Sequence, residues 1–317
     1  MSPWLPRLGR SLRRSLRWSV VVSSPRGEAG EQWGDTWFGR DLVTALQERG
    51  QQARLVHPAG ATSAERDQDD VVLVLRGLKP VIPRATTSRT KWLLWVISHP
   101  DEVNAAEIEP YDAVFAASAN WPRAQSFPKP VLPLLQATNP SRFRPDAAPP
   151  DSGAAVLFVG STRGQFRPVV RDALACGADL SLFGVGWQDL IASQHQRHHL
   201  GEFLPNPQLS AAYAGAGVVL NDHWPDMAEQ GFLSNRLFDA LACGARVVSD
   251  DAVGLHEVFG SAVRTYRSVD ELRPLVTGDF RAQFPDRHER LECAARIAAE
   301  HSFLVRADTL IDVAREL

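Results

Sequence analysis

The stretch Asn221–Gly260, NDHWPDMAEQGFLSNRLFDALACGARVVSDDAVGLHEVFG, decides the fold of this 317-residue chain. The apolar run Ala216–Leu220 leads into it and predicts a buried strand that ends in polar residues. A helix is predicted to begin near Ser234 and to end at Gly244, and Arg246–Ser249 predicts the next strand. Parallel α/β proteins bind anionic ligands where a strand, a polar loop and a helix N-terminus meet. The stretch therefore predicts a site for a nucleotide diphosphate.

The same alternation of strand and helix runs along most of the chain, which predicts parallel sheets. Strands of a first sheet are expected at Trp18–Ser24, Gln52–His57, Val71–Arg76, Lys91–Ser98, Ala113–Ala117 and Val131–Leu134, with a helix at Asp35–Arg49. Strands of a second sheet are expected at Ala154–Gly160, Asp179–Phe183, Gly217–Leu220, Arg246–Ser249 and Val263–Tyr266. The predicted fold is α/β, with two Rossmann-like lobes whose parallel sheets face a central cleft.

The proline-rich polar stretch Gln136–Gly153 separates the two groups of strands and is the predicted linker. We expect an N-terminal lobe at 18–140, the linker itself at 141–153 and a second lobe at 154–290. The helical pattern from about Asp286 to Leu317 lacks internal proline. Its last part, 291–317, is expected to be a helix that crosses back to the first lobe.

The composition favours a soluble globular protein, with 44% apolar and 22% charged residues. The three cysteines, Cys176, Cys243 and Cys293, are far apart and show no disulfide or metal spacing, which favours a reducing cytoplasm. The net charge is −3, and five arginines without any acid lie in residues 1–17, so subtracting them leaves −8 on the rest. This acidic body argues against nucleic acid as a partner.

The basic segment 1–17 has two interpretations. Its leucines fall on one helical face and its arginines on the other, as in a helix on an anionic membrane surface. Alternatively it is a frayed basic tail, because Pro3, Pro6 and Gly9 weaken a helix. No apolar run approaches the ~20 residues that span a bilayer. We therefore expect a cytoplasmic protein whose membrane contact, where it has any, is peripheral and on the inner face.

In the first lobe, polar residues near two strand ends are candidates for catalysis. His99 and Asp101 follow a strand that is apolar on both faces, at the edge where parallel sheets bind ligands. His99 is a candidate for contacting sugar hydroxyls or moving a proton, and Asp101 or Glu102 is a candidate for a base. Alternatively, the segment only ends the strand and caps a helix. Asp35 is a third candidate and lies near the start of the helix that follows the first strand and a glycine-rich loop. Its alternative role is an acid at a helix N-terminus, where the helix dipole stabilises it.

In the second lobe, two glycine-containing turns follow strands. The loop Gly160–Gly164 places Arg163 where backbone N–H groups and a guanidinium can bind phosphate, although Arg163 also suits a solvated surface loop. A slot for the base is predicted from two further loops, with Val185, Trp187, Glu202 and Phe203 as its candidate residues.

The predicted helix after Phe232 carries the strongest candidates. Ser234 and Asn235 suit its first turn, where free N–H groups and the helix dipole attract phosphate. Arg236 is placed to bind a diphosphate, and Asp239, three residues on, to accept both ribose hydroxyls. The alternative is an Arg236–Asp239 ion pair on the surface, worth only a few tenths of a kcal/mol.

These residues resemble a known enzyme family. Its members are GT-B fold glycosyltransferases of the group 1 and CgeB-like type, whose second lobe carries the motif S-x-R-x-F-E-A-x-A-x-G. In register with that motif are Ser234, Arg236, Phe238, Asp239, Ala240, Ala242 and Gly244. The linker QATNPSRFRPD and the WVISHPDEV and FVGSTRGQF segments are also similar to one bacterial subgroup.

The resemblance implies a hexosyltransferase-like enzyme of cell-surface polysaccharide or glycoconjugate synthesis. It would move sugar from a nucleotide diphosphate sugar, UDP-linked by preference or GDP-linked, to a glycan, lipid-linked or small acceptor. The acceptor would bind to the lobe at 18–140 and the nucleotide sugar to the lobe at 154–290. Arg163, Ser234, Asn235 and Arg236 would hold the diphosphate and Asp239 the ribose. No metal or other cofactor is expected, since Asp250–Asp251 lacks the D-x-D spacing.

One position departs from the family pattern. Where many group 1 enzymes have a first glutamate, eight residues before the ribose ligand, this chain has Gly231. The candidates for contacting the donor sugar are then Asn221, Asp222, His223 and Glu229. Two other functions stay open: a nucleotide-sugar epimerase on the same fold, and a non-catalytic nucleotide-sugar-binding assembly protein.

Overall fold

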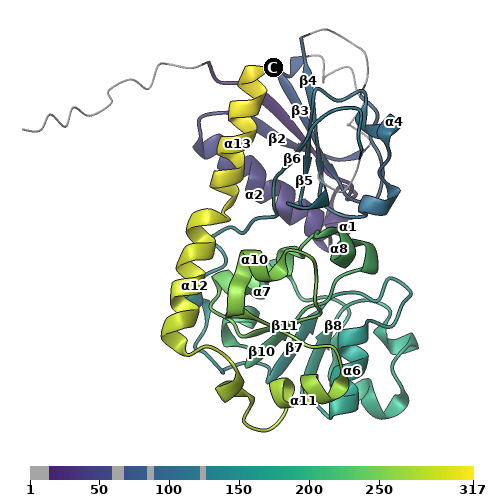
Figure 1. The fold of residues 1–317 in the computed structure, drawn as a ribbon, viewed down its shortest axis with the longest axis vertical. Helices are drawn as coiled ribbons and strands as arrows, with labels where there is room; N and C mark the ends of the chain where they lie inside the picture. The colour runs from purple at the N-terminus through teal and green to yellow at the C-terminus, as the bar shows by residue number, and fades with distance from the viewer. Residues whose placement is uncertain (1–13, 59–67, 84–88, 122–125) are drawn as a thin grey trace, which may run out of the picture.

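The computed structural model describes residues 14–58, 68–83, 89–121 and 126–317. The chain forms two lobes, one above the other in Figure 1. Most of the basic segment lies outside the described residues, so its membrane contact stays a prediction. Within the described part, no helix is both long enough and apolar enough to cross a membrane.

The N-terminal lobe is built on a six-stranded parallel sheet with the order β2-β1-β3-β4-β5-β6. Its strands are β1 (Arg17–Val21), β2 (Gln52–Val56), β3 (Val71–Arg76), β4 (Lys91–Val96), β5 (Ala113–Ala116) and β6 (Val131–Pro133). All six residues of β3 are buried, as expected for a strand covered on both faces.

The C-terminal lobe has a second six-stranded parallel sheet, with the order β12-β11-β10-β7-β8-β9. Its strands are β7 (Val156–Val159), β8 (Leu180–Phe183), β9 (His199–Gly201), β10 (Val218–Leu220), β11 (Val247–Ser249) and β12 (Val263–Thr265). The sequence did not predict β9, which has three residues and begins with a histidine. The two parallel sheets confirm the predicted two-lobe α/β architecture.

Helices cover both sheets. The α-helices are α1 (Glu28–Glu31), α2 (Gly34–Glu48), α4 (Ala105–Ile108), α6 (Pro168–Cys176), α7 (Asn206–Gly215), α8 (Pro225–Gln230), α9 (Asn235–Ala242), α10 (Leu255–Phe259), α11 (Val269–Val276), α12 (Arg287–Glu300) and α13 (Phe303–Glu316). Short 3-10 turns include η2 (Pro100–Glu102), η3 (Pro145–Ala147), η4 (Trp187–Asp189), η5 (Ser193–His198), η6 (Gly260–Ala262) and η7 (Phe280–Gln283).

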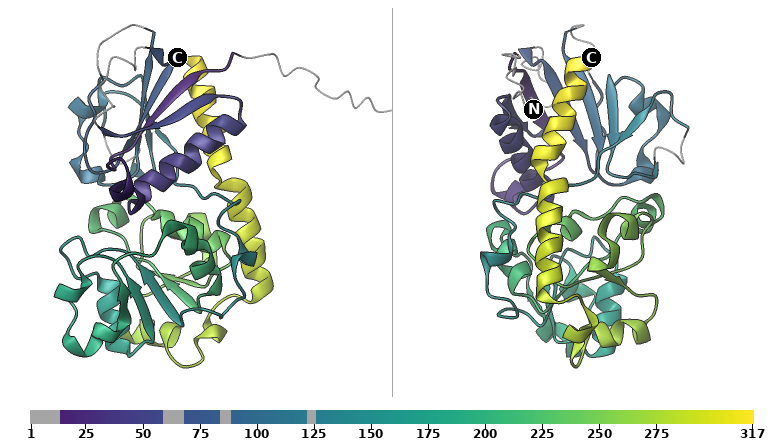
Figure 2. Two further views of the ribbon diagram at one scale, coloured as in Figure 1. Left: turned by 180° about the vertical axis from the view of Figure 1, so that it is seen from behind. Right: turned by 60° about the vertical axis from the view of Figure 1, so that its left-hand side comes forward.

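The last helical stretch is two helices, α12 and α13, rather than one. Between them the backbone pairs with the linker: Thr138 N–H donates to His301 O (2.9 Å) and Phe303 N–H donates to Thr138 O (3.1 Å). These bonds take backbone groups away from a continuous helix. The helix α12 packs on α9 of the C-terminal lobe, and α13 packs on α2 of the N-terminal lobe. Figure 2 shows the pair, in yellow, running along both lobes.

The lobes also meet through α8. Phe232, which follows α8, is fully buried with the N-terminal core, and its ring lies 5.5 Å from that of Trp121. Ser118 Oγ donates to Gln230 O at 2.7 Å. The linker, the α12–α13 pair and α8 therefore all connect the lobes around the cleft.

Candidate functional site

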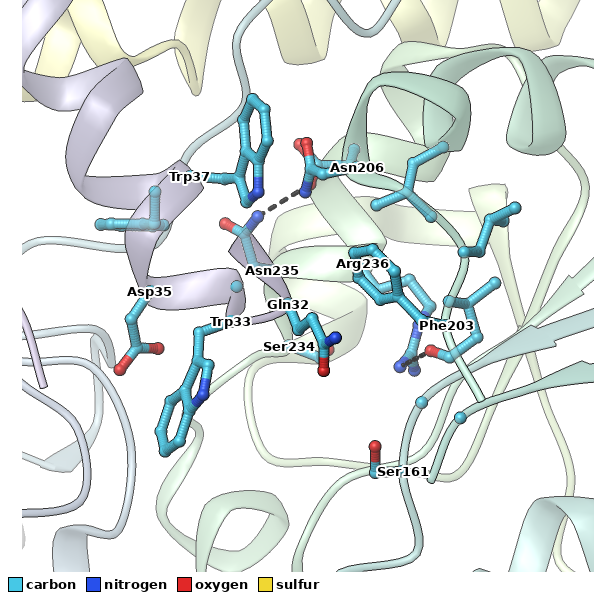
Figure 3. Close-up of a pocket in the computed structure, with 18 of the residues that line it drawn as sticks. Gln32, Trp33, Asp35, Trp37, Ser161, Phe203, Asn206, Ser234, Asn235 and Arg236 are labelled. Carbon is cyan, nitrogen blue, oxygen red and sulfur yellow. Dashed lines mark hydrogen bonds between the residues drawn. The ribbon is translucent and has the colours of Figure 1, made fainter. Parts of the chain in front are cut away.

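A cavity of about 380 Å³ lies between the lobes. Figure 3 shows Trp33 before α2 and Asp35 and Trp37 within it, together with Ser161 of the loop after β7 and Ser234 at the start of α9. Of the residues proposed from sequence, eight line it: Asp35, Arg163, Glu202, Phe203, Ser234, Asn235, Arg236 and Asp239. The cavity thus collects the predicted diphosphate, ribose and part of the base groups, which come from separate segments.

Arg236 is held firmly at the cavity wall. Its Nη1 donates to Asn221 Oδ1 at 2.9 Å and its Nη2 to Val159 O at 2.6 Å. The guanidinium lies 4.9 Å from the centre of the Phe158 ring. A Cβ added at Gly160 would lie 3.0 Å from Nη2, so this glycine leaves room for the guanidinium. The chain therefore holds Arg236 by neutral acceptors, and its positive charge stays available to an anion.

Arg163 adds a second positive charge at the tip of its loop, where its φ of 50° is left-handed. Partial desolvation in the cleft, and then the charge of Arg167, lower the pKa of the Arg163 guanidinium. Arg167 itself is buried and forms a two-pronged ion pair with Asp222, in which Nε donates to Oδ2 at 2.9 Å. Neither Arg163 nor Arg236 forms a salt bridge with any carboxylate that the structure describes. These two charges favour an anionic ligand such as a diphosphate.

Three of the four donor-sugar candidates are buried behind the cavity wall. Asp222 pairs with Arg167, and Asn221 accepts from Arg236. His223 Nδ1 lies 2.7 Å from Asp250 Oδ1, and its Nε2 accepts from the Ser234 N–H at 3.0 Å. Each of these side chains positions the arginines or the start of α9. None of the three is among the residues that line the cavity.

Asp239 lies at the cavity floor and is only 9% exposed. Its Oδ1 accepts from Thr138 Oγ1 and its Oδ2 from Asn235 Nδ2, both at 2.8 Å. The alternative of a surface ion pair with Arg236 is therefore not what the structure contains. Burial raises the pKa of Asp239 to about 7, and outweighs the opposing effect of Arg142.

The base slot is formed only in part by the predicted residues. Glu202 and Phe203 line the cavity, whereas Val185 is 49% exposed outside it. Trp187 corrects the prediction most clearly, because its side chain is fully buried and cannot stack on a base. Its indole N–H donates to Gly160 O at 2.8 Å, which holds the loop Gly160–Gly164 against the lobe.

Several cavity residues were not proposed from sequence. Arg142, in the linker, forms a close ion pair with Asp41 of α2 and a close hydrogen bond with Asn206 of α7. Its guanidinium also lies 5.5 Å from the ring centre of Trp37. The sequence shows an arginine inside the linker and a tryptophan on either side of Asp35. Their contact with one another depends on how the two lobes pack, which the sequence does not show.

The remaining candidates lie outside the cavity lining. His99, with a left-handed φ of 52°, and Asp101 lie beside Asp226 of α8, in a cluster at the other contact between the lobes. Glu229 is exposed on α8. His99 and Asp101 were predicted at the ligand-binding edge of the sheet. In the structure they lie at a contact between the lobes and are not among the residues that line the cavity.

One known family model matches part of the chain, in its second half. Residues 163–312 match a family model described as glycosyl transferase-like. Comparison with curated proteins gave no sequence match.

Solved structures share the whole two-lobe fold. One is a glycosyltransferase involved in avilamycin A biosynthesis, with a TM-score of 0.67, 18% identity, and coverage of 95% of this chain and 98% of that chain. Another is sucrose-phosphate synthase from Thermosynechococcus elongatus, with a TM-score of 0.66, 14% identity, and coverage of 95% and 98%. A third is an alpha-glucosyltransferase in complex with UDP and DNA, with a TM-score of 0.61, 10% identity, and coverage of 95% and 100%. The fold is GT-B, and with the family model it supports a glycosyltransferase.

Proposed function

We propose that this protein transfers a sugar from a nucleoside diphosphate sugar to an acceptor hydroxyl in the interlobe cavity. The observation that carries the proposal is the pair Arg163 and Arg236, which line the cavity near the start of α9 and form no salt bridge with a carboxylate of the described residues. As the bond to the sugar breaks, the leaving diphosphate gains negative charge. Fixed positive groups at that point stabilise the transition state.

The other donor roles follow from position. Ser234 and Asn235 lie at the N-terminus of α9, where the helix dipole favours phosphate, and Asp239 lies one turn further in for the ribose hydroxyls. Glu202 and Phe203 also line the cavity and are the proposed contacts for the base of a UDP- or GDP-sugar. The arginines supply the charge that a metal supplies in other transferases.

On the acceptor side, Asp35 is the proposed base. It lines the cavity from the first turn of α2, and burial raises the pKa of its carboxyl while Arg163 opposes this. The acceptor hydroxyl would give its proton to Asp35 as its oxygen bonds to the sugar, and the nucleoside diphosphate leaves with the bonding electrons. The resemblance to CgeB-like enzymes favours a cytoplasmic, bacterial role in surface glycoconjugate synthesis.

The test begins with the donor. In a thermal-shift panel of UDP-, GDP-, dTDP- and CMP-sugars, the true donor should raise the melting temperature by mass action. With that donor, Arg236→Ala should lower nucleoside diphosphate release by about 10²–10³-fold, the loss typical of one transition-state donor. Arg171→Ala is the matched control, because Arg171 is exposed on α6, away from the cavity.

The products decide between the open functions. Release of nucleoside diphosphate with transfer to an acceptor supports the proposal, and full turnover in Arg236→Ala contradicts it. Conversion of the donor without release would identify an epimerase. Tight nucleotide binding with no release from any donor would identify a non-catalytic binding protein.

A further inference from the structure

A second group of polar side chains joins the lobes outside the cavity. His99 and Asp101 come from the end of the N-terminal sheet and from η2, and Asp226 comes from the first turn of α8. One ligand atom from each side chain lies within 4.8 Å of the other two. Two lobes thus contribute an imidazole and two carboxylates to one point.

Two atoms of this cluster are buried without a partner. Neither His99 Nε2 nor Asp226 Oδ2 has a hydrogen-bond donor among the described residues while both carboxyls are ionised, although Asp226 can share a proton with Asp101. An unsatisfied buried polar atom costs about 1–3 kcal/mol, so two of them side by side call for a ligand that satisfies both. Asp101 is more exposed, which leaves the cluster open to solvent on one side.

Charges of both signs act on the cluster. Burial, and then Arg163 and Arg76, lower the pKa of His99, while Glu102 and Asp101 raise it. Burial, a side-chain hydrogen bond with Asp101 and the charge of that carboxyl raise the pKa of Asp226 to about 6, while the backbone N–H groups of Met227 and Asp226 lower it. A metal ion held by the two carboxylates would take the place of the proton that they share.

The backbone fixes the cluster from both sides. His99 adopts a left-handed φ of 52° immediately before Pro100, and Asp226 follows Pro225 at the start of α8. A left-handed conformation is costly for histidine and is retained where the surroundings require it. The ring is therefore held beside the carboxylates rather than free to turn away.

We propose that His99, Asp101 and Asp226 bind a divalent transition-metal ion, Zn²⁺ or Mn²⁺, that clips the two lobes together. One imidazole with two carboxylates is a ligand set for such ions, and water would fill the remaining positions. Bonds of about 2.0–2.2 Å place tetrahedral ligands about 3.3–3.6 Å apart, so the 4.8 Å limit needs only small side-chain rotations. None of the three residues is among those that line the cavity, although the charge of Arg163 acts on His99. The inference does not depend on the proposed transfer reaction.

The experiment uses the full chain after dialysis against a chelator. Calorimetry with Zn²⁺ or Mn²⁺ alone should show one bound ion, and saturating metal should raise the melting temperature. His99→Asn, Asp101→Asn and Asp226→Asn should each weaken binding at least tenfold. Asparagine is chosen at position 99 because it tolerates the left-handed backbone. Glu229→Gln, an acid on the same helix outside the cluster, and Arg236→Ala should bind metal as the wild type does.

Each outcome bears on the proposal. Absence of metal binding by the wild type, or equal binding by all three cluster variants, overturns it. Removing a carboxylate also removes repulsion, so Asp226→Asn should melt no lower than the metal-free wild type. If that variant melts higher while metal leaves the wild type unchanged, the two acids share a proton instead, and the metal proposal fails. Metal binding without donor turnover would leave this proposal standing and the proposed function in doubt.

Discussion

At the scale of single residues, Arg236 and Asp239 show how one helix separates two tasks. They are three positions apart, yet Arg236 faces Asn221 and Val159 while Asp239 faces Thr138 of the linker. The two side chains do not form an ion pair with each other. Burial of the Asp239 carboxyl raises its pKa to about 7.

This shift predicts a pH dependence. Asp239 titrates near 7 when folded and near 3.8 when unfolded, so between these values the folded chain holds the additional proton. Stability should then fall as pH rises through this range. Relative to Asp239→Asn, the wild type should lose about 2–3 kcal/mol between pH 5 and pH 8, measured by urea unfolding.

Nucleotide affinity should change in the opposite direction. Ribose hydroxyls donate best to an ionised carboxylate, so the wild type should bind donor more tightly at pH 8 than at pH 6, and Asp239→Asn should not. Parallel pH profiles for the two proteins, in stability and in affinity, would rule out Asp239 as the titrating group.

At the scale of elements, Gly231 lies between α8 and α9, at the position where the resemblance leads us to expect a glutamate, and it is tightly packed. Gly231 ends α8 with a left-handed φ of 72°. A Cβ there would lie 2.9 Å from Val253 O and 3.1 Å from Ser118 Oγ. The position that carries a glutamate in the resembling enzymes is therefore closed against the other lobe.

Gly231→Ala should accordingly cost more than backbone strain alone. We expect about 2–4 kcal/mol, since a left-handed alanine costs about 1–2 kcal/mol and the contact with Val253 O adds to it. Gly177→Ala is the control, because Gly177 has a similar φ of 75° and nothing within 4 Å of its added Cβ. Equal losses in urea unfolding would show that the space at Gly231 does not matter. Gly231→Glu should disrupt this packing rather than add a functional carboxylate.

Elements also mark what sequence could predict. Strand β3 is apolar in all but its last residue, Arg76, and follows from local pattern. The Arg163 segment stands out because it follows β7, and the Arg236 segment because it begins a helix that lies between two buried strands. The three-residue β9 and the break before α13 depend on partners distant in sequence. For the same reason, the meeting of Arg142 with Asp41 and of His99 with Asp226 could not be predicted.

At the scale of the whole molecule, the last helix completes the first lobe. Leu310 of α13 is fully buried in the same core cluster as Phe38 and Leu42 of α2. Arg306 joins α13 to the linker, donating to Leu135 O at 2.7 Å and to Gln136 O at 3.0 Å. The N-terminal lobe therefore cannot reach its packed state without the end of the chain.

This arrangement predicts that the lobes unfold together. Leu310→Ala should cost about 2–5 kcal/mol, as for other leucines removed from a core, whereas Leu291→Ala, at a side chain that is 36% exposed on α12, should cost little. Two probes report on different lobes: most tryptophans lie in the N-terminal lobe, whereas Cys176, Cys243 and Cys293 all lie beyond the linker.

In urea, tryptophan fluorescence and thiol reactivity should therefore give one midpoint, and Leu310→Ala should move both by the same free energy. Because Leu310 does not touch the cysteines' lobe, a shared shift can arise only if the joints at α8, the linker and α13 transmit it. A shift confined to fluorescence would mean that the lobes are independent folding units, held side by side without energetic coupling.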